Sequence, residues 1–349
     1  MKKLFSNYIF NFALILTLTL LGLWFALFDS YKTVFATVAA MPLWRVGVMI
    51  AWGLAPQLVY GVILMIMARS LNQKYPYRHG LVNALIGSFV SGITPSATGG
   101  QLAQALTFKK QGLSTTQGAG LVWMDFYINE VVLVVFTLFL FILKMASFRN
   151  PAITFLFAFA LLVNGAIIAI LWIMVEYPKL YHIIFKWLIT LLGKLRFIKR
   201  KDKIIEGWNN QMVHFHAATE AVAGNKALVI KIAALYGLRL VIYFTTPYII
   251  AMLLGFQVTF GQFVEFLALA AFVSMANTFV PLPGASGATE GLFVLVFSTV
   301  IGKAGAASMM IFWRFTTFYV PLLVGGFIFI RRRRSKQIVI NDENAKDPA

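Results

Sequence analysis

The chain has 349 residues, of which 60% are hydrophobic and 12% charged, and it carries a net charge of +18 and no cysteine. Soluble proteins carry about 25% charged residues, so this composition excludes an ordinary soluble enzyme. The missing thiols exclude disulfides and thiolate metal sites. The basic residues lie in short segments between apolar stretches, which favours loops that face anionic lipid headgroups and argues against a nucleic-acid partner.

Six apolar stretches are long enough to cross about 30 Å of hydrocarbon as helices. In chain order they are residues 8–28, 44–68, 117–143, 152–175, 228–254 and 306–330.

Two further apolar stretches, 81–108 and 262–300, are broken in the middle by segments rich in proline and glycine. These residues stop helices. The arms 81–93 and 288–300 have thirteen residues each, so each spans about 20 Å and is too short to cross alone. The arm 262–280, in contrast, is long enough to cross.

The distribution of Lys and Arg distinguishes crossing from re-entrant hairpins. Suppose that each broken stretch enters and leaves the membrane on the same side. The basic residues Lys2 and Lys3, the basic segment 176–226 and the run Arg331–Arg334 then all face the cytoplasm. The positive-inside rule requires that arrangement. We therefore predict an all-α polytopic membrane protein with six spanning helices, two re-entrant broken-helix hairpins and both termini in the cytoplasm.

This topology predicts an inverted repeat. Residues 44–143 and 228–330 each contain a span, a broken hairpin and a second span, and the two hairpins enter from opposite sides. Transporters commonly have this plan, with the site near the bilayer midplane between the broken helices.

One integral membrane domain is predicted over residues 1–334. Within segment 176–226, helically spaced apolar residues such as Trp208 and Phe215 lie beside charged ones, which predicts an amphipathic helix on the cytoplasmic surface. The polar residues 335–349 predict a disordered tail.

Charged residues inside the spans are the first candidates for a site, because each costs about 2.5–3.5 kcal/mol to insert. Two interpretations are open: the arginines hold an anionic headgroup, or they pair with the acids as structural ion pairs. Either acid of 117–143 is also a candidate for exchanging a proton during transport. The candidates are Arg239, Arg314, Asp125, Glu130 and Glu290.

The two breaks are predicted to supply the rest of the site. A helix that starts inside the membrane directs free N–H groups and a positive dipole end toward an anion, and such starts are expected near Gly100 and Ala288. The alternative is that the small residues serve close helix packing. The candidates in the breaks are Thr94, Pro95, Ser96, Thr98, Gly99, Gly100, Gln101, Pro283, Gly284, Ser286, Gly287 and Thr289.

The two break motifs resemble those of the lysylphosphatidylglycerol synthase transmembrane-region family. They are TPSATGGQ at 94–101 and PLPGASGATE at 281–290, with Arg314 in the last span. The family is also called flippase-like and corresponds to the membrane half of the bacterial multiple peptide resistance factor. Two departures from its pattern are Ala285, in place of a glycine, and Phe126, which follows Asp125 where many members have arginine.

The resemblance covers nearly the whole chain and implies movement of lipids across the membrane. We expect a flippase of the bacterial cytoplasmic membrane that moves a phosphate-bearing lipid, with an aminoacylated headgroup as one option. The alternative is a membrane-embedded accessory or catalytic subunit in lipid modification. The full-length synthase adds a soluble aminoacyltransferase domain that this chain lacks, so we expect no phosphatidylglycerol lysyltransferase activity.

We expect no cofactor or metal, because the sequence contains no Walker motif, nucleophile elbow or metal-ligand spacing. The expected partners are membrane lipids, and both a homo-oligomer and a lipid-synthesis protein remain open as further partners.

Overall fold

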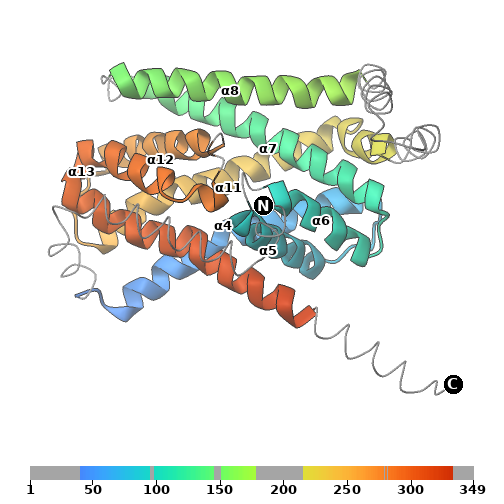
Figure 1. The fold of residues 1–349 in the computed structure, drawn as a ribbon, viewed down its shortest axis with the longest axis horizontal. Helices are drawn as coiled ribbons and strands as arrows, with labels where there is room; N and C mark the ends of the chain where they lie inside the picture. Colours follow the sequence, from blue (N-terminus) through green and yellow to red (C-terminus); the bar gives the residue numbers. More distant parts are fainter. Residues whose placement is uncertain are drawn as a thin grey trace, which may run out of the picture.

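The computed structural model describes residues 40–94, 98–144, 151–177, 215–278, 280 and 282–332. Within these ranges all the regular secondary structure is helical, and six helical segments are long and apolar enough to cross a membrane (Figure 1). The helices are α4 (Leu43–Arg69), α5 (Tyr77–Ile93), α6 (Thr98–Lys110), α7 (Thr115–Leu143), α8 (Pro151–Glu176), α11 (Lys226–Leu253), α12 (Phe263–Asn277) and α13 (Ala288–Arg314).

Four predicted spans are confirmed as the continuous helices α4, α7, α8 and α11. The last predicted span, 306–330, lies within the last helix, which continues from α13 through a π-helical turn at Phe315–Tyr319 to residue 332. The predicted span 8–28, most of segment 176–226 and the tail 335–349 lie outside the described residues.

The first broken stretch forms a hairpin of α5 and α6. Hydrogen bonds join the start of α5 to the end of α6. The Tyr75 hydroxyl donates to Gln111 Oε1 at 2.5 Å, and Gln111 Nε2 donates to the His79 carbonyl at 2.9 Å. Burial raises the pKa of Tyr75 well above its usual value, so this hydroxyl stays protonated and remains a donor. Re-entry of this hairpin from the cytoplasm stays a prediction.

The second broken stretch also doubles back on itself. Its arms are α12 and the first half of α13, which ends at Gly302, where φ is 75° and ψ is 163°. That conformation suits a residue without Cβ, and the chain turns there into the long last helix (Figure 1). Phe256, which precedes α12, lies against Gly305, which follows the turn. Both units therefore share one plan of helix, two arms and helix.

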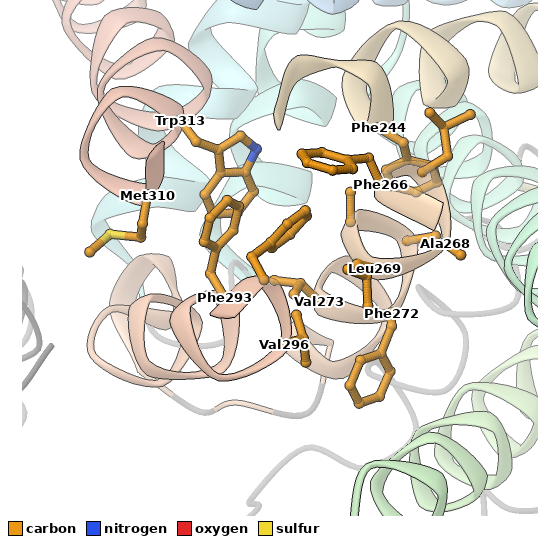
Figure 2. Close-up of a cluster of buried hydrophobic side chains, with 14 of the residues drawn as sticks. Phe244, Phe266, Ala268, Leu269, Phe272, Val273, Phe293, Val296, Met310 and Trp313 are labelled. Atoms are coloured by element: carbon orange, nitrogen blue, oxygen red, sulfur yellow. The ribbon is translucent and has the colours of Figure 1, made fainter. Parts of the chain in front are cut away.

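A cluster of apolar side chains joins α11, α12 and α13 (Figure 2). The rings of Phe293 and Trp313 stack with centroids 4.7 Å apart, and Phe293 also stacks on Phe297 at 4.3 Å. Within a membrane such contacts stabilise helix association through dispersion and close fit. Because Arg314 directly follows Trp313, this packing fixes the start of the Arg314 side chain.

The structure describes only the end of segment 176–226, which is predicted to be an amphipathic surface helix. Residues 215–223 are helical, and Phe215, Ala218 and Val222 are buried. The Phe215 ring lies edge-on to Trp123 of α7, with centroids 6.1 Å apart. The apolar face of this short helix therefore packs on the helix bundle, and its place on the cytoplasmic surface stays a prediction.

Candidate functional site

A cavity of about 630 Å³ lies where the two broken stretches approach each other. Its wall is built from α4, α5, α6, α7, α8, α11, α12, the second break and the last helix. This is the place that an inverted-repeat plan predicts for a site. The polar residues of the wall are Gln57, Ser88, Ser91, Gln101, Asn129, Glu130, Arg239, Tyr243, Ser274, Asn277, Thr278 and Thr317.

Arg239 lines this cavity from the middle of α11. Its guanidinium lies over the rings of Tyr60 and Tyr236, 4.3 and 5.8 Å from their centroids. Its Nη1 is 3.5 Å from Asn129 Oδ1, which is a long hydrogen bond. Within the described ranges no carboxylate oxygen lies within 4.0 Å of the Arg239 nitrogens. The guanidinium is therefore held by aromatic faces, and most of its donors have no protein acceptor there.

Asp125 lies behind these two tyrosines. The Tyr60 hydroxyl donates to Asp125 Oδ2 at 2.7 Å, and the Tyr236 hydroxyl donates to Oδ1. Gln104 Nε2 of the first hairpin donates to the Tyr60 hydroxyl at 2.6 Å. Asp125 is thus connected to Arg239 through the two rings, and the same network ties α6 to α4, α7 and α11.

Arg314 is engaged by the second break. Its Nε lies 2.9 Å from Glu290 Oε1, and its Nη2 donates to the Gly284 carbonyl at 2.5 Å and to Ser286 Oγ at 3.1 Å. The guanidinium also lies 4.0 Å from the centroid of Phe318. Both charged side chains are buried. This geometry supports the structural ion-pair interpretation for Arg314 and Glu290.

At the two helix starts beside the breaks, side chains of the protein accept backbone N–H groups. Glu290 Oε2 accepts the Gly287 N–H at 2.6 Å, and Thr94 Oγ1 accepts the Gly99 N–H at 3.1 Å. One N–H at each start is therefore already accepted within the protein, and binding of a ligand by the other N–H groups stays a prediction. Thr289 is buried and donates within the break, to the Ala285 carbonyl at 2.8 Å or to Asn277 Oδ1 at 2.9 Å.

The break residues differ in their relation to the cavity. Gln101 and Gly284 line it. Gly100 packs against α5, since an added Cβ would lie 1.8 Å from Ser91 Oγ, which is the close helix packing that was the alternative interpretation. Pro283 is buried in the break. Pro95, Ser96 and the side chain of Thr98 lie outside the described residues.

A family model described as the lysylphosphatidylglycerol synthase TM region matches residues 9–325. The chain belongs to this family. No curated protein matches it. Membership of the family, together with the six apolar helices, makes this a multi-pass membrane protein of a lipid-related family.

Sequence reasoning missed several polar residues of this site, among them Tyr60, Gln104 and Asn129. Tyr60 follows Gln57 by three residues in the apolar helix α4, so both point to one face. Polar pairs at helical spacing within a span were the available signal. Asn129 directly precedes the charged Glu130, which was chosen as the candidate instead. Gln104 lies in α6 among other polar residues, so its polarity alone did not distinguish it.

Proposed function

We propose that the protein moves a lipid with a phosphate-bearing headgroup across the bacterial cytoplasmic membrane. The headgroup passes through the cavity between the two broken stretches, while the acyl chains stay in the surrounding lipid. Membership of a lipid-related membrane family and a cavity with polar side chains on a largely apolar wall support this proposal.

The observation that carries the proposal is that the Arg239 guanidinium lines the cavity with few hydrogen-bond acceptors around it. A guanidinium in a membrane protein is costly unless it meets an anion or polar groups, and here it has two aromatic faces and one distant amide oxygen. Its planar fork matches the paired oxygens of a phosphate. A lipid phosphate in the cavity would supply the missing acceptors.

Arg314 has a different role in this proposal. Its guanidinium already meets a carboxylate, a carbonyl and a hydroxyl, so it keeps the second break folded against the last helix. The phosphate is therefore assigned to Arg239 alone, with the Asn129 amide as a further donor on the wall.

Lipid binding to the purified protein tests this assignment. Phosphatidylglycerol, its lysyl ester and a neutral diglucosyl lipid would be titrated onto the parent, Arg239→Gln and Arg239→Lys. A charge-assisted hydrogen bond contributes about 1.5–3 kcal/mol, so Arg239→Gln should weaken binding of both phosphate lipids by about ten- to a hundredfold. Arg239→Lys should fall between the two, because it keeps the charge and loses the fork. Tightest binding of the neutral lipid, unchanged in Arg239→Gln, would contradict the proposal.

A further inference from the structure

Glu130 is the one acid on the cavity wall within the described residues, and its surroundings differ from those of Asp125. Its side chain is only 4% exposed, and its Oε2 is buried without a hydrogen-bond partner in the part of the chain that the structure describes. Asp125, five residues earlier on α7, accepts hydrogen bonds from two phenols on its two oxygens. The two acids of this helix are therefore not equivalent.

The groups that face Glu130 from the surrounding helices are few. On the described cavity wall, α11 contributes the charged Arg239 and the titratable Tyr243, whereas the other helices contribute neutral amides and hydroxyls. The guanidinium of Arg239 reaches Asn129 and not Glu130. Glu265, the acid of α12, lies in the first turn of that helix and off the wall.

An isolated carboxylate is very unfavourable at such a position. Burial of an ionised carboxyl without a partner is so costly that the group takes up a proton instead. The charged form becomes favourable when a cation or strong donors arrive at the carboxyl. A carboxyl that lines a cavity and has an oxygen without a hydrogen-bond donor is suited to such an exchange.

We propose that Glu130 is protonated while the cavity holds no cation, and that it exchanges this proton for the ammonium group of a lipid headgroup. This rests on the proposed function, because the ammonium arrives on the lipid whose phosphate Arg239 binds. The carboxylic acid loses its proton to water in the open cavity, and the resulting carboxylate pairs with the ammonium. The headgroup then binds through two ion pairs, phosphate with Arg239 and ammonium with Glu130.

Under this exchange, lipids with and without an amine differ in the number of protons that the protein releases when they bind. Phosphatidylethanolamine brings a phosphate and an ammonium, so its binding releases a proton from Glu130. Phosphatidylglycerol brings a phosphate alone, so Glu130 keeps its proton. A pH gradient would then act on the movement of the first lipid and not on that of the second.

Calorimetry in buffers of different ionisation enthalpy measures this proton release. The purified parent should release about one proton per bound phosphatidylethanolamine near neutral pH, and close to none with phosphatidylglycerol. Glu130→Gln, which keeps the shape and removes the proton, should release none with either lipid. Glu265→Gln removes an acid away from the cavity and is the matched control, so it should behave as the parent does.

Infrared difference spectroscopy tests the protonation without a transport or binding assay. The spectrum of lipid-free parent at neutral pH minus that of Glu130→Gln should contain the C=O band of a protonated carboxyl, and the difference with Glu265→Gln should not. Absence of the band, or equal proton release by parent and Glu130→Gln, would overturn the exchange even if lipids bind. A band that is present while no phospholipid binds the parent would instead contradict the proposed function and leave the proton site standing.

Discussion

At the scale of single residues, the two arginines of the spanning helices, Arg239 and Arg314, have different surroundings. Arg314 is enclosed by Glu290, the break carbonyl and Ser286, whereas Arg239 rests on two tyrosine rings and faces a cavity. Both satisfy the rule that intramembrane charge is paired or lines a polar space. The difference gives each arginine its own measurable consequence.

Removing one partner of the Arg314–Glu290 pair should destabilise the protein. Arg314→Gln leaves the fully buried Glu290 without its cation, which costs about 3–5 kcal/mol for a buried pair. We expect a clear drop in the melting temperature of the detergent-solubilised protein. The double variant with Glu290→Gln should recover part of that loss, because no unpaired charge remains. A double variant as unstable as the sum of the single variants would show that the two residues do not interact.

Asp125 should affect anion binding indirectly, as a positioning residue. Its carboxylate holds the hydroxyls of Tyr60 and Tyr236, whose rings support Arg239. A cation–π contact is worth about 0.5–2 kcal/mol, so Asp125→Asn should weaken phosphatidylglycerol binding by about two- to thirtyfold. Tyr60→Phe, which keeps the ring and removes its hydrogen bond, should have a smaller effect. A loss in Asp125→Asn larger than in Arg239→Gln would mean that Asp125 contacts the lipid itself.

At the scale of helices, close approach between small residues joins the hairpin arms. Gly100 of α6 meets α5 so closely that a methyl group would overlap Ser91 Oγ. Gly100→Ala should therefore separate the arms and lower the melting temperature. Gly165→Ala in α8 is the matched control, because nothing lies within 4 Å of its added Cβ and alanine favours the helix by about 1 kcal/mol. Equal melting temperatures of the two variants would show that the α5–α6 contact does not matter for stability.

The sequence predicted elements better than it predicted partners. Runs of about twenty apolar residues and proline–glycine breaks are local signals, and they placed α4, α7, α8, α11 and both broken stretches. Pairing is not local: Arg314 meets Glu290 across 24 positions, and Asp125 meets Tyr236 across 111. Composition showed that arginines and acids share the membrane region, but only the packing of helices decides which acid caps a helix and which faces the cavity.

At the scale of the whole molecule, the predicted orientation is directly testable. The chain has no cysteine, so single cysteines are clean reporters. If the α5–α6 hairpin is re-entrant, Arg78→Cys and Lys110→Cys lie on the same cytoplasmic side, and both should resist an impermeant thiol reagent in intact cells. Lys303→Cys, which directly follows the second arm of the second hairpin at Gly302, should react from outside. The three parent side chains lie on the protein surface, and opposite labelling at Arg78 and Lys110 would show that the first hairpin crosses.

Lipid movement in reconstituted vesicles tests the central claim most directly. Vesicles of phosphatidylcholine would contain the protein and a headgroup-labelled fluorescent phosphatidylglycerol, and an impermeant reductant would quench label in the outer leaflet. The account predicts that the parent brings inner-leaflet label out to be quenched, that Arg239→Gln does so much more slowly, and that Glu265→Gln matches the parent. If vesicles with the parent retain as much protected label as protein-free vesicles, or if Arg239→Gln moves the lipid as fast as the parent, the cavity is not a lipid path governed by Arg239.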